Sequence, residues 1–200
     1  MPRANLTRPV VLSAAAELAD RDGFDAISIS ELARHFGVKP ASLYSHVRDR
    51  GAVIEGVHEI ALDELADRVA AAIGGRSATD ALIGFGEAHR RYAEQRPGCW
   101  TALQRPASPG TMASAAAQRM GAQLVAVIRG YELPEPEIVH AARLVGATIN
   151  GFLTLERVGS FGNRDEDTEA SWARALSALD VALSAWATHT VRPTEMEERA

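Results

Sequence analysis

The 200-residue chain contains a single cysteine, Cys99, which excludes an internal disulfide framework and a zinc site built from cysteines. Lys39 is its only lysine, so arginine supplies nearly all of its positive charge. No apolar run approaches the roughly 18 uncharged residues of a membrane span, and the N-terminus lacks the apolar core of a signal peptide. We therefore expect a cytoplasmic protein that makes no contact with a membrane.

The sequence also lacks the motifs of common enzyme classes. It has no Gly-rich phosphate loop, no G-x-S-x-G and no H-E-x-x-H. Its six histidines are scattered along the chain without the spacing of metal ligands. We therefore expect no enzymatic activity, no cofactor and no metal ion.

The net charge of −5 argues, as a total, against a nucleic-acid partner. The distribution of the charges changes that interpretation. Residues 1–58 carry seven basic and seven acidic side chains, and residues 34–50 hold four basic side chains against Asp49 alone. An acidic total is therefore compatible with a small basic surface that contacts DNA.

Apolar residues recur at helical spacing along the chain, and no segment alternates as a half-buried strand does. Gly and Pro separate the apolar segments. We expect an all-α fold of about nine helices, over residues 8–22, 31–36, 40–46, 49–72, 79–95, 100–104, 109–130, 136–158 and 168–189. Ser30 is expected to cap the second helix and Ser108 the seventh. The change of helix length predicts two domains, residues 1–48 and 49–200, with helix 49–72 as the link.

Residues 28–47 contain the parts of a helix-turn-helix, in which a tight turn sets the second helix for the major groove of DNA. Gly37 permits the left-handed backbone of the turn. Leu32 and Leu43 belong to the small core beneath the two helices. The outward positions carry small or hydrogen-bonding side chains suited to base edges: Pro40, Ala41, Ser42, Tyr44, Ser45 and His46. The alternative is an ordinary surface turn between two helices.

The stretch Ile29–Arg50, ISELARHFGVKPASLYSHVRDR, resembles the signature of TetR-type transcriptional repressors. The resemblance is strong over about residues 6–60. Beyond that it is one of length and architecture, with a similar penultimate helix from Asn150 to Phe161. It implies a homodimer with N-terminal domains that bind a double-stranded DNA operator and a helical body that binds a ligand. It also implies base contacts from Lys39, Ala41, Ser42 and His46, and phosphate contacts from Thr7, Ser28, Tyr44 and Arg50.

A heptad-like apolar row on helix 168–189 predicts a contact between two chains, made together with helix 136–158. Helix 136–158 is apolar on two faces, which indicates burial on both. We expect a dimer interface made by Leu144, Gly151, Leu155, Trp172, Leu176, Leu179, Leu183 and Trp186. The alternative is that the row packs within one chain.

Polar groups on apolar helix faces predict a ligand pocket in the body. A buried polar group costs roughly 1–3 kcal/mol unless it is paired, and a ligand can supply the partner. We expect the pocket to be lined by Phe85, His89, Tyr92, Trp100, Met112, Met120, Gln123, Asn150 and Thr154. For any single one of these, pairing with a neighbouring group is the alternative. The set is more apolar than charged, which favours a hydrophobic or aromatic small molecule.

The sequence thus predicts a DNA-binding regulator, a repressor that a small-molecule effector releases from a palindromic operator. Ligand binding would shift helix 49–72 and change the spacing of the two recognition helices. Two alternatives stay open. One is a helix-turn-helix protein without an effector, and the other is a helical scaffold that contacts only proteins.

Overall fold

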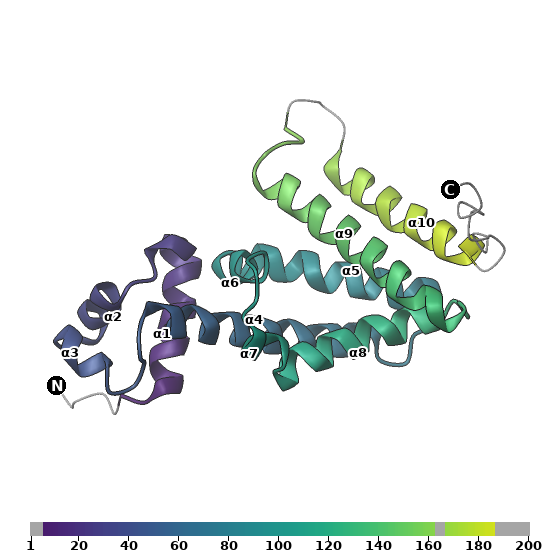
Figure 1. The fold of residues 1–200 in the computed structure, drawn as a ribbon. Helices are drawn as coiled ribbons and strands as arrows, with labels where there is room; N and C mark the ends of the chain where they lie inside the picture. Colours follow the sequence, from purple (N-terminus) through teal and green to yellow (C-terminus); the bar gives the residue numbers. More distant parts are fainter. Residues whose placement is uncertain (1–5, 163–166, 187–200) are drawn as a thin grey trace, which may run out of the picture. The chain divides into compact units, whose positions relative to one another are not determined.

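The structure is a computed structural model that describes residues 6–162 and 167–186. Over these residues the chain forms ten α-helices and two short 3-10 turns, with no strand (Figure 1). The expected all-α class is confirmed. The elements are α1 (Arg8–Asp22), η1 (Phe24–Ala26), α2 (Ile29–Phe36), α3 (Pro40–Leu43), α4 (Arg50–Ile73), α5 (Ala78–Gln95), α6 (Pro97–Leu103), α7 (Pro109–Met112), α8 (Ala115–Arg129), η2 (Glu135–Glu137), α9 (Ile138–Arg157) and α10 (Thr168–Trp186).

The helices group into two compact units. Unit 1 contains Met1–Ala72 and Glu87–Gln123, and unit 2 contains Ile73–Gly86 and Leu124–Ala200. The first three helices therefore share a unit with α6 and with most of α4. The last three residues of the expected helix 168–189 lie outside the described residues.

The N-terminal part of unit 1 is a three-helix core in which side-chain caps fix the helix starts. Thr7 caps the N-terminus of α1. Ser28 caps the N-terminus of α2 by accepting a hydrogen bond from the N–H of Glu31 at 3.1 Å. The cap expected at Ser30 is therefore wrong, because Ser28 has the extended backbone that a cap requires while Ser30 is already helical. The core beneath the helices contains Val11, Ala15, Leu18, Phe24, Ile27, Leu32, Ala33 and Leu43.

The segment 109–130, expected as one helix, forms the two helices α7 and α8. Ser108 caps the first by accepting a hydrogen bond from the N–H of Thr111 at 3.1 Å. Ser114 caps the second by accepting one from the N–H of Ala117 at 3.2 Å. The second cap restarts the helix, because its hydroxyl satisfies an amide that a continuous helix would pair with a carbonyl.

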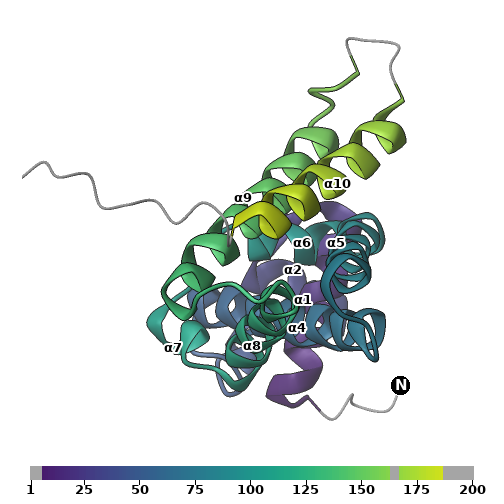
Figure 2. The same cartoon turned by 90° about the vertical axis from the view of Figure 1, so that its right-hand side faces the viewer.

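In unit 2, α9 and α10 lie side by side (Figures 1 and 2). The ring of Trp172 on α10 lies 5.1 Å from that of Phe152 on α9, measured between centroids. Leu176 faces α5, since a Cβ on Gly86 would lie 2.7 Å from its side chain. The apolar row expected as a seam between chains is therefore buried inside one chain: Trp172, Leu176, Leu179 and Leu183 are each at most 4% exposed. Four of the eight residues expected at the dimer interface are thus already buried within their own chain.

Polar contacts join the C-terminal half of α10 to the rest of unit 2. The carboxylate of Asp180 accepts hydrogen bonds from the hydroxyls of Thr79 and Tyr131, each at 2.7 Å. The indole of Trp186, also expected at the dimer interface, is half-buried and donates to Glu137 at 2.9 Å. These contacts fix the register of α10 within its own unit.

One described segment, Glu135–Arg157, is long and apolar enough to cross a membrane by length and composition alone. The sequence criterion above missed it because Arg143 interrupts the apolar run. In the structure this segment packs Val145, Ile149 and Leu153 into the core of unit 2. A helix that is buried along one face in a helical protein has the same composition.

Candidate nucleic-acid interface

The turn between α2 and α3 has the backbone that a helix-turn-helix needs. Gly37 is left-handed, with φ +64°, and closes α2. The N–H of Val38 donates to the carbonyl of Ala33 at 2.9 Å. Leu43 and Val47 are buried below α3, which leaves the opposite side of α3 at the surface. This is the geometry by which a short helix is presented to the major groove.

The side chains expected to contact DNA gather around this short helix. Lys39 precedes it, and Tyr44 follows with 56% of its surface exposed. The hydroxyl of Ser45 donates to the carbonyl of Ser42 at 2.7 Å and closes the helix end. Most of the side chains expected to contact DNA are exposed to solvent here: Lys39, Pro40, Ala41, Ser42 and Tyr44. His46 is half-buried. Helix α3 ends at Leu43, so residues 44–46, expected as helix, form a turn.

The positively charged side chains near α3 differ in whether they already belong to an ion pair. Arg34 pairs with Glu31, and Arg48 pairs with Asp49 at 2.8 Å. The hydrogen bond from Arg48, followed by that from the N–H of Ala52, lowers the pKa of Asp49, which caps α4. Within residues 6–162 and 167–186, Lys39 forms no ion pair. Its ammonium is therefore available to an external anion.

The expected phosphate contacts from Thr7, Ser28 and Arg50 already have structural partners. The Thr7 and Ser28 hydroxyls accept helix-capping bonds, and each keeps its own O–H for donation. Arg50 Nε donates to the carbonyl of Ile27 at 2.6 Å and so ties the start of α4 to the residue before the Ser28 cap. This tie was not predicted from the sequence.

We expect Arg50→Gln to act on the fold of the helix-turn-helix more than on phosphate binding. Loss of a hydrogen bond from a charged donor should lower the free energy of unfolding by about 1.5–3 kcal/mol, measured by urea denaturation. The slope of log K against log salt for DNA binding should stay within about half a unit of the wild type. A slope smaller by about 0.9 at unchanged stability would instead assign Arg50 to a phosphate.

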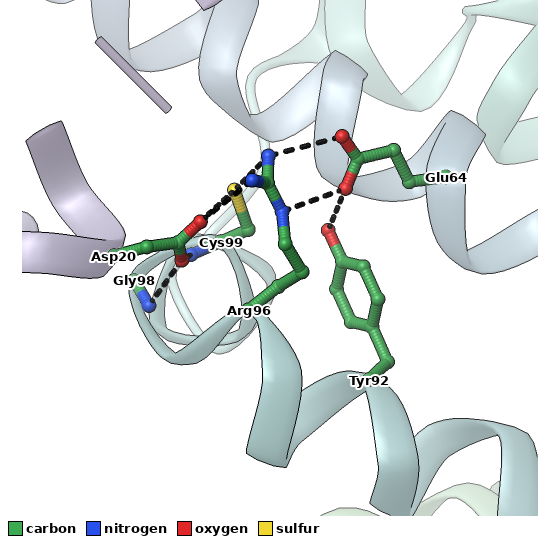
Figure 3. A network of polar contacts seen from close by, with 6 residues as sticks. All are labelled: Asp20, Glu64, Tyr92, Arg96, Gly98 and Cys99. Atoms are coloured by element: carbon green, nitrogen blue, oxygen red, sulfur yellow. Dashed lines mark hydrogen bonds and ion pairs between the residues drawn. The ribbon is translucent and has the colours of Figure 1, made fainter. Parts of the chain in front are cut away.

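Behind the helix-turn-helix, unit 1 contains a cluster of polar groups from α1, α4, α5 and α6 (Figure 3). Arg96 lies between two carboxylates: Nη1 is 3.0 Å from Asp20 of α1, and Nε and Nη2 each donate to Glu64 of α4 at 3.0 Å. The hydroxyl of Tyr92 also donates to Glu64, at 3.1 Å. Asp20 accepts from the backbone N–H groups of Gly98 and Cys99 at the start of α6, at 2.8 and 3.0 Å. We call these residues, Asp20, Glu64, Tyr92, Arg96, Gly98 and Cys99, the Asp20 joint.

The Asp20 joint depends on the absence of a side chain at Gly98. A Cβ there would lie 2.1 Å from the carbonyl carbon of Ala19 and 2.5 Å from the backbone nitrogen of Asp20. The backbones of α1 and α6 are therefore in direct contact. Sequence reasoning missed this cluster because its members are up to 79 residues apart.

The residues expected to line a ligand pocket fall into both units. Phe85, Asn150 and Thr154 belong to unit 2, and the other six belong to unit 1. In unit 1, His89, Tyr92 and Trp100 are buried, and the rings of His89 and Trp100 meet edge to face at 6.3 Å. Met112 is 63% exposed. Thr154 is also exposed, so neither of these two lines the interior of its own unit.

Several polar atoms in the body part of unit 1 are buried without a hydrogen-bond partner among the described residues. They include Arg68 Nη1, Trp100 Nε1 and Gln123 Oε1. The guanidinium of Arg68 lies over the ring of Tyr92, 4.6 Å from its centroid. The amide nitrogen of Gln123 donates to the carbonyl of Ala66 at 2.9 Å, so only its oxygen lacks a partner. Arg68 did not stand out in the sequence, because an arginine on a long helix is usually solvated.

An open cleft of about 340 Å³ lies elsewhere in unit 1, between α1, α4 and the start of α8. Leu12, Gly56 and Ile60 form its apolar part, and Arg8 and Glu59 contribute charges. None of the nine expected ligand residues lines this cleft.

Comparison with known proteins gives two family models that match successive parts of the chain. Residues 11–57 match the bacterial regulatory proteins of the tetR family, and residues 82–179 match the tetracyclin repressor-like C-terminal domain. An uncharacterized HTH-type transcriptional regulator of Mycobacterium tuberculosis, Rv0681, is 29% identical over 93% of this chain and 85% of its own length.

Solved structures of the same fold also align along most of the chain. ActR of Streptomyces coelicolor, in complex with (S)-DNPA, has a TM-score of 0.73 at 18% identity, covering 92% of this chain and all of ActR. The TetR family regulator PfmR of Thermus thermophilus has a TM-score of 0.61 at 25% identity, covering 90% of this chain and 97% of PfmR.

The N-terminal match covers α2, Lys39 and α3, and the C-terminal match covers helices from both units. Proteins with these two domains are regulators and not enzymes, which confirms the expectation drawn from the missing motifs. The chain is therefore a member of the TetR family of transcriptional regulators, with a DNA-binding helix-turn-helix at its N-terminal end.

Proposed function

We propose that the protein is a cytoplasmic repressor that a small-molecule effector releases from a palindromic operator. The observation that carries this proposal is the surface around α3. Lys39 there has no ion pair within the described part of the chain, Ser42 and Tyr44 are exposed, and Leu43 fixes the helix from below. A cation beside small and hydrogen-bonding side chains suits phosphates and base edges at the same time.

We expect the exposed side chains to divide between positioning and base recognition. Tyr44→Phe should weaken binding to operator and random DNA alike, about 3- to 10-fold, because it removes one hydrogen bond to the sugar-phosphate backbone. Ser42→Ala should reduce the preference for the operator by about 1–3 kcal/mol and leave binding to random DNA unchanged. Fluorescence anisotropy on both duplexes measures these effects. Equal losses on the two duplexes for both variants would contradict this division.

The proposed dimer uses faces of α9 and α10 that are left open within one chain. Val139, Leu155, Val158 and Val181 are large apolar side chains at the surface there. Gly151 is also exposed, and a Cβ at this position would meet nothing within 4 Å, so a second backbone could approach closely. Of the expected contacts, Leu144, Gly151 and Leu155 remain part of this proposal. Two recognition helices about 34–36 Å apart would then read two half-sites.

The proposed effector is an aromatic molecule that carries a hydrogen-bond acceptor, most simply an aromatic carboxylate. Its support is the pair of donors that are buried without partners among the described residues, Arg68 Nη1 and Trp100 Nε1, together with the rings of His89 and Tyr92. A buried donor without an acceptor costs roughly 1–3 kcal/mol, which an anionic ligand would remove. The small-molecule complex of the fold neighbour ActR gives further support.

We expect naphthalene-1-carboxylate to raise the melting temperature of the protein and to weaken operator binding, and the matched carboxamide to do neither. A ligand at about 100 times its Kd stabilises the folded state by roughly 2.7 kcal/mol. Arg68→Met should weaken binding of the carboxylate about 10-fold or more, whereas Arg91→Met, at an exposed position of the same protein, should not. Equal binding of acid and amide would contradict the anionic class. If no compound of a broad metabolite panel released the protein from DNA, the protein would be a regulator without an effector.

A further inference from the structure

The open cleft of unit 1, between α1, α4 and the start of α8, has an aliphatic floor. Leu12 and Gly56, the two buried residues of its lining, pack so closely that a Cβ on Gly56 would lie 2.5 Å from both methyl carbons of Leu12. Ile60 continues the apolar surface one turn further along α4, and none of the nine described residues that line the cleft is aromatic. Its volume of about 340 Å³ is at the lower end of the range for small-molecule sites. We call it the α1–α4 cleft.

Two side chains of opposite charge line the α1–α4 cleft. Arg8 precedes Leu12 by about one helical turn and is exposed, and Glu59 follows Gly56 by about one turn and is half-buried. Each therefore lies within roughly 5 Å of helix rise of the place where α1 and α4 meet. Within residues 6–162 and 167–186, neither forms an ion pair, with the other or with a third residue. Both charges are therefore available to a ligand that lies on the floor.

The remaining charge of the lining, Asp63, is already neutralised. Its carboxylate lies 2.7 Å from Nη2 of Arg119, which also donates to the carbonyl oxygen of Asp63 at 3.0 Å. Ser114 contributes a hydroxyl whose oxygen accepts from the N–H of Ala117, so that its own O–H remains for donation. Among the described residues that line it, the cleft thus offers one free cation, one free anion and a hydroxyl around an aliphatic floor.

We propose that the α1–α4 cleft binds an aliphatic α-amino acid. Its carboxylate pairs with Arg8, its ammonium group pairs with Glu59, and its side chain lies on Leu12 and Ile60. An amino acid supplies both charges one carbon apart, whereas a simple acid or amine would leave one of the two protein charges unpaired. The lining shares no residue with the donors of the proposed effector site. The inference therefore goes beyond the proposed function and does not depend on it.

The first test compares three ligands of nearly the same shape on the full-length wild-type protein by isothermal titration calorimetry. L-Leucine carries both charges, 3-methylbutylamine lacks the carboxylate and 4-methylpentanoate lacks the ammonium group. We expect L-leucine to bind with a Kd of about 1 mM, an ordinary affinity for a ligand of this size. Each analogue should bind about 5-fold more weakly, the upper end of what a solvent-accessible ion pair contributes. No binding of L-leucine, or equal binding of L-leucine and either analogue, would overturn the proposal.

The second test assigns the two charges to the cleft. Arg8→Gln should bind L-leucine no more tightly than 3-methylbutylamine, because the carboxylate has lost its partner. Glu59→Gln should likewise bind L-leucine no more tightly than 4-methylpentanoate. Arg21→Gln and Glu55→Gln are the matched controls, since they change exposed side chains of the same two helices outside the cleft. Both controls should keep the wild-type preference for L-leucine, and a preference that survives both cleft substitutions would overturn the site.

The result can be told apart from that of the proposed function. Arg8 and Glu59 hold no ion pair within the described part of the chain, so both variants should fold, which urea denaturation checks, and the ligand series on the wild type needs no variant. Loss of L-leucine binding in Arg68→Met would place the amino acid at the proposed effector site and overturn the cleft proposal. Failure of naphthalene-1-carboxylate to release the protein from DNA would count against the proposed effector alone and leave the L-leucine result standing.

Discussion

Gly98→Ala is expected to lower the free energy of unfolding by about 3 kcal/mol, the upper end of the usual cost of overpacking. The new Cβ would lie 2.1 Å from the carbonyl carbon of Ala19 and 2.2 Å from its oxygen. Both neighbours are backbone atoms, so α1 and α6 would have to separate. Urea denaturation measures the stability. The affinity for a DNA duplex from upstream of the protein's own gene should fall as the stability falls.

Gly121→Ala is the matched control for this substitution. Gly121 also lies within a helix of unit 1, and a Cβ there would meet nothing within 4 Å. Alanine should stabilise that helix by up to about 1 kcal/mol, because it forms helices more readily than glycine. Equal stabilities of the two variants would show that α1 and α6 are not in contact in solution.

Trp172→Ala is expected to lower the free energy of unfolding by about 3–5 kcal/mol, the usual cost of removing a buried aromatic side chain. Trp172 is 1% exposed and packs on Phe152 within unit 2. The loss should appear in urea denaturation at every protein concentration, because the packing lies inside one chain.

The outer face of the same helix should respond differently. Val181→Ser changes a side chain that is 63% exposed on α10. We expect the stability of the monomer to stay within about 0.5 kcal/mol of the wild type, and dimer dissociation in sedimentation equilibrium to increase about 10-fold. A dimer weakened by Trp172→Ala at unchanged chain stability would return the buried row to the interface between chains.

Helix starts and the recognition turn could be predicted from the sequence where local chemistry decides them. Helix α1 runs from Arg8 to Asp22 as expected, because Pro9 favours a helix start and Gly23 ends it. The α2–α3 turn follows from Gly37 in the same way. The prediction of Ser30 instead of Ser28 as the cap of α2 was wrong, because either serine fits the pattern and only the backbone angle separates them.

Contacts between distant segments could not be predicted, because spacing along one helix does not name its partner. The row from Trp172 to Leu183 has the period of a seam whether it packs on the same chain or on another. The tie from Arg50 to Ile27 and the bonds of Arg96 leave no local pattern, since their partners lie 23 to 76 residues away. Arg96 is 76 residues from Asp20, and no residue between them indicates the pair.

The proposed function requires that the surface around α3 recognises a specific operator. The most direct measurement is fluorescence anisotropy of the wild-type protein with the duplex from upstream of its own gene, against a shuffled duplex, at about 0.15 M salt. We expect binding to the upstream duplex to be at least about 1000-fold tighter than to the shuffled one, the lower bound for specific DNA-binding proteins. We also expect Lys39→Ala and Ser42→Ala each to reduce this ratio. Equal affinity for the two duplexes, or a ratio that neither substitution changes, would contradict it.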